Sequence, residues 1–154
     1  MRKILNKDEV ISCIKGIIDP KEYIKFAYIF GSFAENREKK DSDIDIGLFI
    51  SGIGEENYFN IKVDIQLEIQ EIIKKTVDVI IMNTAPPFLN HEIFRNGIII
   101  KNDDPALLSQ FRAKNFYYYL DQMYIINSYL KSVKEKIGMN LNNVCLQVPQ
   151  KRGE

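Results

Sequence analysis

The segment from Gly31 to Ile50 constrains the fold of this chain more than any other. A small-residue turn, Gly31-Ser32, ends one apolar run, and ten residues separate Ser32 from Asp43. Asp43 and Asp45 then open a second apolar run that continues to Ile50. Because side chains alternate along a strand, aspartates at this spacing project from one face while the residues between them enter the core. The segment predicts two strands joined by a charged loop, with two carboxylates side by side.

Two carboxylates this close together indicate a divalent cation. Each negative charge raises the pKa of the other unless a cation lies between them. Mg2+ favours carboxylate oxygens together with substrate phosphates. The Gly31-Ser32 turn suits a phosphate, because glycine lets the backbone approach a ligand, and the following amides and the Ser32 hydroxyl can donate to it. The alternative, two solvated aspartates on an edge strand, is disfavoured by this turn at this spacing.

A third carboxylate is expected if phosphoryl transfer uses two metal ions. Asp78 is the first choice, because it lies between two valines in a predicted strand, where an uncompensated charge would be costly. If its strand lies beside the Asp45 strand, its carboxylate would reach the same ions. It would then act as base toward the acceptor, the group that attacks the phosphate. Asp64 is the second choice, in case the segment around it is a strand.

The remaining pattern predicts an α/β (α+β) fold, with a small mixed sheet of about four strands flanked by helices. Alternation from Ile61 to Ile69 also fits a strand, but the run continues to Lys75, and this length favours a helix. Asn6, three residues before Glu9, predicts a helix start. Strands are expected at 24–30, 42–50, 76–82 and 98–100, and helices at 7–19, 32–36 (a single turn), 61–75, 86–94 and 106–136.

Length and composition predict a single domain over residues 1–138, followed by a polar tail over 139–154. Lys+Arg and Asp+Glu number 21 each, so no global charge favours nucleic acid, and we expect no direct nucleic-acid binding. Cys13 and Cys145 lack the spacing of a zinc site or a disulfide framework. The N-terminus has no apolar core of a signal peptide, and charges interrupt every long apolar run. We therefore expect a cytoplasmic protein that does not contact a membrane.

Several other residues have weaker signals. Arg37, Lys39 and Lys40 could contact a triphosphate, although a charged loop is usually only solvated. His91 is more typical of a short helix surface than of a metal ligand. The run 117–119 of three tyrosines cannot all face inward, so part of it is expected in the core and part on a partner surface. A stacking platform for nucleic acid is less favoured, since no basic stripe accompanies it.

The signature of Gly31, Ser32, Asp43 and Asp45, with Asp78 on a later strand, resembles the minimal nucleotidyltransferases of the DNA polymerase beta superfamily. More specifically, it resembles the MntA-type antitoxins that pair with HEPN ribonuclease toxins. The strand TVDVIIMN, the turn NGIIIKNDDP and the helix FRAKNFYYYLD extend the resemblance over almost the whole chain. They are less specific than the catalytic signature.

The resemblance implies a small palm-like fold without added nucleic-acid-binding domains. It implies that Asp43, Asp45 and Asp78 hold Mg2+, with two ions expected, and that Gly31 and Ser32 bind the nucleotide. The implied reaction transfers AMP from ATP to a tyrosine of the cognate HEPN toxin and silences it.

The chain departs from this family at residues 34–36, where Ala-Glu-Asn replaces a frequent Ala-Arg-Gly. Asparagine tolerates the left-handed backbone that glycine would adopt, so we expect the turn at Asn36 to survive. Glu35 replaces a positive charge near the expected triphosphate. Alternative functions are nucleotidyl transfer to a small hydroxylated molecule such as an aminoglycoside, transfer to an RNA end, and steric masking of a toxin without catalysis.

Overall fold

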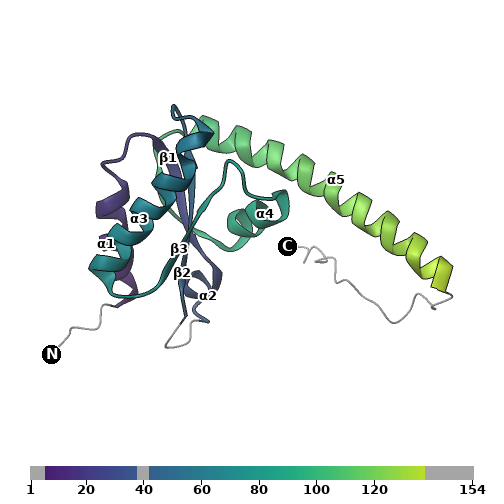
Figure 1. The fold of residues 1–154 in the computed structure, drawn as a ribbon, viewed down its shortest axis with the longest axis horizontal. Helices are drawn as coiled ribbons and strands as arrows, with labels where there is room; N and C mark the ends of the chain where they lie inside the picture. Colours follow the sequence, from purple (N-terminus) through teal and green to yellow (C-terminus); the bar gives the residue numbers. More distant parts are fainter. Residues whose placement is uncertain (1–5, 38–41, 138–154) are drawn as a thin grey trace, which may run out of the picture. The chain divides into compact units, whose positions relative to one another are not determined.

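A four-stranded mixed sheet, in the order β3-β2-β1-β4, forms the centre of the fold (Figure 1). The computed structural model describes residues 6–37 and 42–137. Strand β1 pairs antiparallel with β2 and β4, and β2 pairs parallel with β3, which confirms the predicted fold class. The elements are α1 (Lys7–Ile18), β1 (Ile24–Phe30), α2 (Gly31–Ala34), β2 (Ile44–Ile50), the 3-10 turn η1 (Glu55–Asn57), α3 (Tyr58–Ile73), β3 (Val77–Ile81), α4 (Pro87–Asn96), β4 (Ile98–Asn102) and α5 (Pro105–Ile137).

The chain forms two compact units, residues 1–119 and residues from 120 onward. The first unit contains the sheet, helices α1 to α4 and the beginning of α5. The described part of the second unit is the remainder of α5, up to Ile137. Tyr124, Ile125 and Tyr129 in that remainder are exposed.

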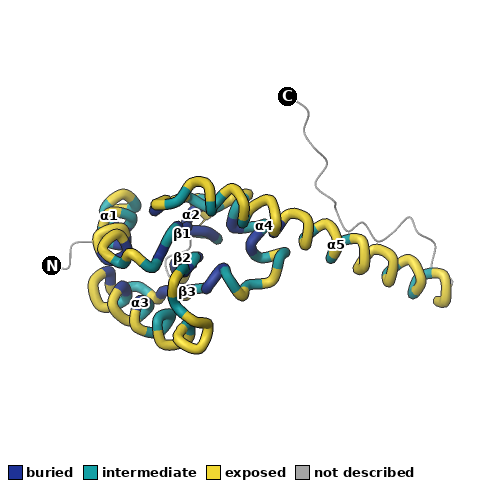
Figure 2. Tube along the Cα trace, turned by 90° about the horizontal axis from the view of Figure 1, so that it is seen from above, coloured by how far each residue is buried: buried dark blue, intermediate teal, exposed yellow. Residues whose placement is uncertain are grey.

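Alternation along the strands gives the sheet two chemically different faces. The aliphatic face carries Ile44, Ile46 and Leu48 of β2, all fully buried, and is covered by α1 and α3. The aromatic face carries Phe26 and Tyr28 of β1 and packs against α4 and the first turns of α5. Figure 2 shows the buried strands between helices whose outer surfaces are exposed. The core predicted from alternation in the Asp45 strand is therefore confirmed.

Local signals in the sequence position the starts of α1 and α5. The Asn6 side chain accepts a hydrogen bond from the Glu9 amide, and the Glu9 carboxylate accepts one from Asn6, which confirms the predicted cap. The ambiguous segment is helix α3, whose Ile65 and Ile69 enter the core, so the helix interpretation is confirmed. Helix α5 starts where the Asp104 carboxylate accepts from the Leu107 amide at 2.9 Å.

The outer edge of β3 is covered by side chains of α3. The Gln70 amide donates to the Val77 carbonyl at 3.1 Å, and the Val79 amide donates to the Gln66 side-chain oxygen at 3.3 Å. Edge strands with unpaired backbone groups invite pairing with other chains, and covering them is a common protection. These two glutamines therefore satisfy one carbonyl and one amide of the edge without adding a strand.

A buried lysine joins β4 to the end of α1. The Lys101 ammonium donates to the carbonyls of Ile18, Asp19 and Lys21 at 3.3, 3.0 and 3.0 Å, and it pairs with Asp103 at 3.1 Å. A cation here is favourable because the last carbonyls of a helix lack intrahelical donors and carry partial negative charge. The lysine thus replaces the missing donors.

Helix α5 is largely exposed along its length. Asn115 is its only buried residue among those described, and its side chain donates to the Pro87 carbonyl at the start of α4 at 3.1 Å. Tyr117 and Tyr118 are exposed, whereas Tyr119 is half-buried. None of the three is therefore buried in the core, where part of the run was expected, although Tyr119 differs from its two neighbours in being half-buried. Within 6–37 and 42–137, every helix falls short of the length or apolarity that a bilayer crossing requires.

Candidate active site

Two of the three predicted acids face each other on adjacent strands. Asp45 of β2 and Asp78 of β3 are direct partners in the parallel register. Both alternate with residues of the aliphatic face, so their side chains project from the opposite, aromatic face. Phe30, the last residue of β1, is the partner of Asp45 on its other side. The turn that begins at Gly31 therefore starts beside Asp45.

Asp43 completes the acidic group from just outside the strand, because β2 begins at Ile44 rather than at residue 42. The Thr76 hydroxyl donates to its carboxylate. Burial raises the pKa of Asp45, and the charges of Asp78 and Asp43 raise it further. The structure thus brings Asp43 and Asp78 within electrostatic reach of Asp45, the least exposed of the three predicted acids.

The Gly31 turn leaves room for the Asp45 carboxylate. Gly31 has φ +69°, a conformation that side chains disfavour, and a β-carbon added there would collide with the carboxylate oxygen of Asp45. Ser32 follows in the single-turn helix α2, whose end is closed by the Arg37 amide donating to the Ser32 carbonyl at 2.9 Å. The two halves of the signature are therefore in direct contact.

The unusual residues at the end of this turn are accommodated. Asn36 has φ +55°, which confirms the expected left-handed backbone. The Glu35 carboxylate pairs with Arg37, so its negative charge is neutralised locally. The Lys7 ammonium donates to the Asn36 side chain at 2.6 Å and to the Ala34 carbonyl at 3.2 Å. Helix α1 therefore supports the turn, a role that nothing in the sequence indicated.

The remaining candidates have different surroundings. Lys39 and Lys40 lie outside the described residues. Asp64 is exposed on α3, and its charge acts on Tyr23, which precedes β1 at the end far from Gly31. It therefore does not join the acids. His91 stacks on the ring of Tyr119 at 3.9 Å between centroids, in an environment unlike that of a metal ligand.

The family profile described as "Polymerase beta, Nucleotidyltransferase" matches residues 12–106, more than half of the chain. The chain belongs to this family. The matched residues include Asp43, Asp45 and Asp78, which lie where β1, β2 and β3 meet.

Relatives of this nucleotidyltransferase agree with the assignment. A Methanocaldococcus jannaschii protein named as a candidate protein adenylyltransferase is 36% identical over 78 residues, which are 51% of this chain and 81% of the relative.

Three solved structures of toxin–antitoxin complexes share the fold. One, of an MntA complex with two substitutions, has a TM-score of 0.66 at 16% identity and covers 84% of this chain and 98% of that one. A second, crystallised with AMP-PNP, has a TM-score of 0.65 at 18% identity, with the same coverage. The third, a tri-AMPylated Shewanella oneidensis HEPN toxin with its MNT antitoxin, has a TM-score of 0.65 at 15% identity and covers 83% and 98%.

The acids of this nucleotidyltransferase suit a divalent cation in type and charge. Carboxylate oxygens are the ligands that Mg2+ prefers. Burial raises the pKa of Asp45 most, the charges of Asp78 and Asp43 raise it further, and a cation between the carboxylates would favour the ionised form. Over the described residues, however, no three acidic, imidazole or thiol groups already stand at metal-ligating positions. Asp43 is hydrogen-bonded by Thr76, and Asp78 pairs with the Lys62 ammonium at 3.4 Å. Lys62, which sequence reasoning missed, places a positive charge beside the acids.

Proposed function

We propose that this nucleotidyltransferase is an antitoxin that transfers AMP from ATP to a tyrosine hydroxyl of a cognate HEPN toxin. The observation that carries the proposal is the convergence of Asp43 and Asp78 around Asp45, in contact with the Gly31 turn. The printed descriptions of the relatives support the choice of acceptor, since one is named for protein adenylylation and another contains an AMPylated HEPN toxin.

The three acids would hold Mg2+, with two ions proposed, which neutralises the charge of the triphosphate when bound. The amides and hydroxyl of the Gly31-Ser32 turn would donate to the phosphate oxygens. Lys62, which pairs with Asp78, could offset part of the remaining charge, and Arg37 follows the turn but is paired with Glu35.

In the proposed step, the tyrosine oxygen attacks the α-phosphorus of ATP, and the bond from this phosphorus to the bridging oxygen breaks. Pyrophosphate leaves, and a phosphodiester joins AMP to the tyrosine. The phenolic proton passes to the Asp78 carboxylate, which is exposed on the edge strand β3. An accessible base suits an acceptor that belongs to another macromolecule, and it favours a protein over a small enclosed substrate.

The test is transfer of label from ATP to the HEPN partner. The protein is incubated with α-phosphate-labelled ATP, Mg2+ and the cognate toxin. We expect the toxin to become labelled and to carry AMP on a tyrosine, as mapped by mass spectrometry. Asp43→Ala and Asp45→Ala should abolish the label. Asp64→Ala is the matched control, because it removes an exposed carboxylate of the same chain that lies apart from the acids, and it should label normally.

If Asp43→Ala and Asp45→Ala both still neutralise the toxin although no label is transferred, the protein acts by steric masking and the proposed transfer is wrong. Label on an RNA end or on a small hydroxylated molecule, with the toxin unlabelled, would instead identify one of the other transferase functions.

A further inference from the structure

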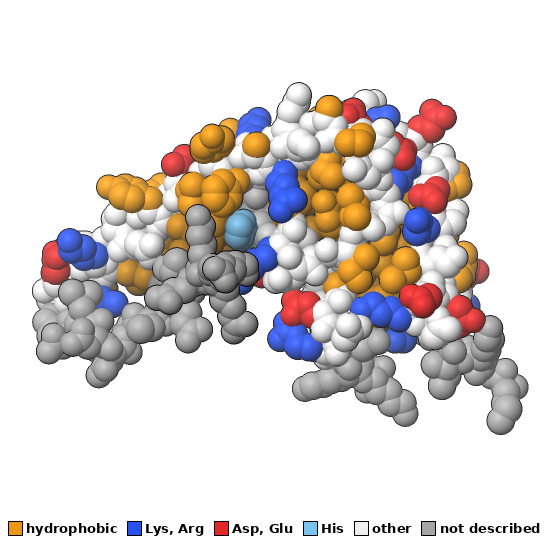
Figure 3. Space-filling model, turned by 180° about the vertical axis from the view of Figure 1, so that it is seen from behind, with side chains coloured by type: hydrophobic (Ala, Val, Ile, Leu, Met, Phe, Trp, Pro, Cys, Tyr) orange, Lys and Arg blue, Asp and Glu red, His pale blue; other side chains and the backbone are white. Residues whose placement is uncertain are grey.

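A cavity of about 580 Å3 lies between α4 and the first turns of α5. It belongs entirely to residues 1–119 and includes none of the three acids. Small-molecule sites typically have volumes of about 300–1,000 Å3. Figure 3 shows the single imidazole of the chain on this surface, beside basic and hydrophobic side chains. The residues that matter here are His91, Phe94, Arg95, Ser109, Arg112 and Phe116.

The residues that line the cavity include two arginines and no acidic residue. Within the described chain, Arg95 and Arg112 take part in no ion pair. Burial lowers the pKa of His91, Glu92 on the same helix raises it in part, and the charges of Arg95 and Arg112 lower it further. Both arginines therefore lie close to the imidazole. Two guanidinium groups from different helices, together with the Ser109 hydroxyl, suit a phosphate group, which guanidinium binds with two parallel hydrogen bonds.

The other wall of the cavity is aromatic. The His91 ring stacks on the Tyr119 ring, with ring centroids 3.9 Å apart and ring planes at 9°. The centroid of the Phe116 ring lies 6.1 Å from that of His91. The Arg112 guanidinium lies over the Phe94 ring at 5.8 Å. Flat rings and guanidinium planes are the surfaces on which aromatic groups stack. The cavity therefore combines a site for an anion with a site for a planar ring.

We propose that this cavity binds a phosphate ester carried by an aromatic group, of the size of a nucleoside monophosphate. Arg95 and Arg112 contact the phosphate, and the aromatic group packs against the wall formed by Phe94, Phe116 and His91. Such a ligand has two sources, a free mononucleotide or an AMP group already attached to a partner tyrosine. The second source rests on the proposed function, whereas the cavity itself does not.

The single histidine provides a direct probe. In the full chain, with EDTA present to keep metal-bound nucleotide from the acids, the NMR signals of the His91 imidazole are followed during titration with AMP. We expect saturable shifts and a higher pKa for His91, because a bound anion stabilises the imidazolium form. Asp45→Ala should bind AMP in the same way, which separates this site from the active site.

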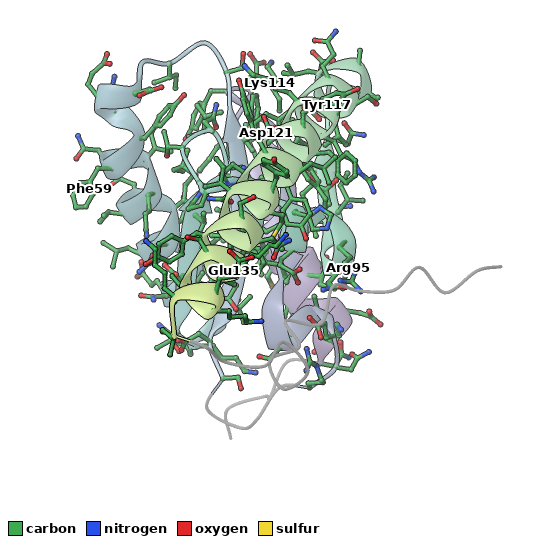
Figure 4. All side chains as sticks on the ribbon, turned by 90° about the vertical axis from the view of Figure 1, so that its right-hand side faces the viewer. Phe59, Arg95, Lys114, Tyr117, Asp121 and Glu135 are labelled. Atoms are coloured by element: carbon green, nitrogen blue, oxygen red, sulfur yellow. The ribbon has the colours of Figure 1, made fainter. Side chains whose placement is uncertain are left out.

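The variants Arg95→Ala and Arg112→Ala should each weaken AMP binding at least tenfold. The control is Lys114→Ala, which removes a positive charge from α5 where the ammonium lies over Tyr118 rather than in the cavity (Figure 4 labels Lys114 and Arg95). The melting temperature of each variant verifies that it is folded. If Arg112→Ala unfolds because its contact with Phe94 is lost, Arg95→Ala alone tests the contribution of the arginines to AMP binding.

Further titrations use inorganic phosphate and a short peptide bearing AMP on tyrosine. Tighter binding of the peptide than of AMP supports the tyrosine-borne source, and the reverse order supports the free nucleotide. The proposal is overturned if AMP leaves the His91 signals unchanged at millimolar concentration, if both arginine variants bind as well as the wild type, or if inorganic phosphate binds as tightly as AMP.

Discussion

The two faces of the sheet differ in chemistry although they share the same four strands. On the aliphatic face, Ile44, Ile46 and Leu48 are sealed beneath α1 and α3. The aromatic face carries rings, including the stacked pair Phe26 and Phe49 at 4.5 Å, and only part of it is covered. The acids and the basic cavity both belong to the aromatic side of the molecule. In strand β2, stability and chemistry are therefore assigned to alternate residues.

This division explains how a strand can carry repelling charges. The cost of holding Asp45 ionised near Asp43 and Asp78 is met by the isoleucines that alternate with it, which bury fully on the other face. Substitutions at neighbouring positions should therefore separate activity from stability, and four predictions test that separation.

The largest effect is expected for Asp45→Asn. Loss of the central carboxylate should lower the rate of AMP transfer by about 10^3-fold or more if Asp45 holds Mg2+ as proposed. The melting temperature at pH 7 should stay equal or rise, because the raised pKa of Asp45 means that its ionised form destabilises the folded state. This difference should shrink as the pH falls through that pKa, since the carboxyl is then neutral. A clear drop in melting temperature at pH 7 would contradict the division.

The next substitution is Ile46→Ala, one residue away on the aliphatic face. Its side chain is fully buried, so we expect a loss of about 3 kcal/mol in the free energy of unfolding, measured by urea denaturation. Transfer activity per folded molecule should change little at temperatures where the variant is folded. Activity loss comparable to that of Asp45→Asn would show that the two faces are coupled.

Two glycine substitutions should change stability less than Ile46→Ala does, and in opposite directions from each other. Gly31→Ala should destabilise by about 1–2 kcal/mol and impair transfer, because its φ is +69° and its β-carbon would meet Asp45. Gly16→Ala, in helix α1 with no atom within 4 Å of the new methyl group, should stabilise by about 0.5–1 kcal/mol. Thermal melts and transfer assays on both variants measure the contrast. If both substitutions changed stability and transfer activity equally, Gly31 would have no special role in the turn beside Asp45.

The smallest effect concerns His91 on the aromatic side. Its pKa is lowered by burial, so the unfolded chain binds more protons than the folded one between that pKa and 6.5. Stability should therefore fall as the pH decreases from 6.5 through the lowered pKa. His91→Phe keeps a ring to stack on Tyr119 and should flatten this dependence of the melting temperature. An unchanged slope would mean that other groups cause it.

Much of this architecture could be predicted because its signals are local. The Asn6 cap, the alternation around Asp45 and the Asp104 helix start each depend on residues close in sequence. The ambiguous run at 61–75 was resolved by its length, and α3 proved to be a helix. The grouping of Asp78 with Asp45 required knowledge that β3 lies next to β2, which the resemblance to the family supplied.

The contacts that escaped prediction join residues far apart in sequence. Lys101 binds carbonyls about eighty residues earlier, at the end of α1. Lys7 supports the turn at Asn36, and Lys62 reaches around the edge strand to Asp78. A lysine in a sequence usually indicates a solvated surface position, so only the three-dimensional fold reveals these roles. The cavity between α4 and α5 has the same origin, because its two arginines come from separate helices.

The glutamines that cover β3 have a consequence for how this protein can meet other proteins. The acids lie at one rim of the sheet, and a rim with free amides and carbonyls would recruit strands indiscriminately, up to fibrous self-association. Because the side chains of Gln66 and Gln70 bond the Val79 amide and the Val77 carbonyl, a strand added at this edge would have to displace both of them. A partner that leaves these two bonds in place would have to recognise this part of the edge through side chains, which discriminate between partners better than backbone pairing does.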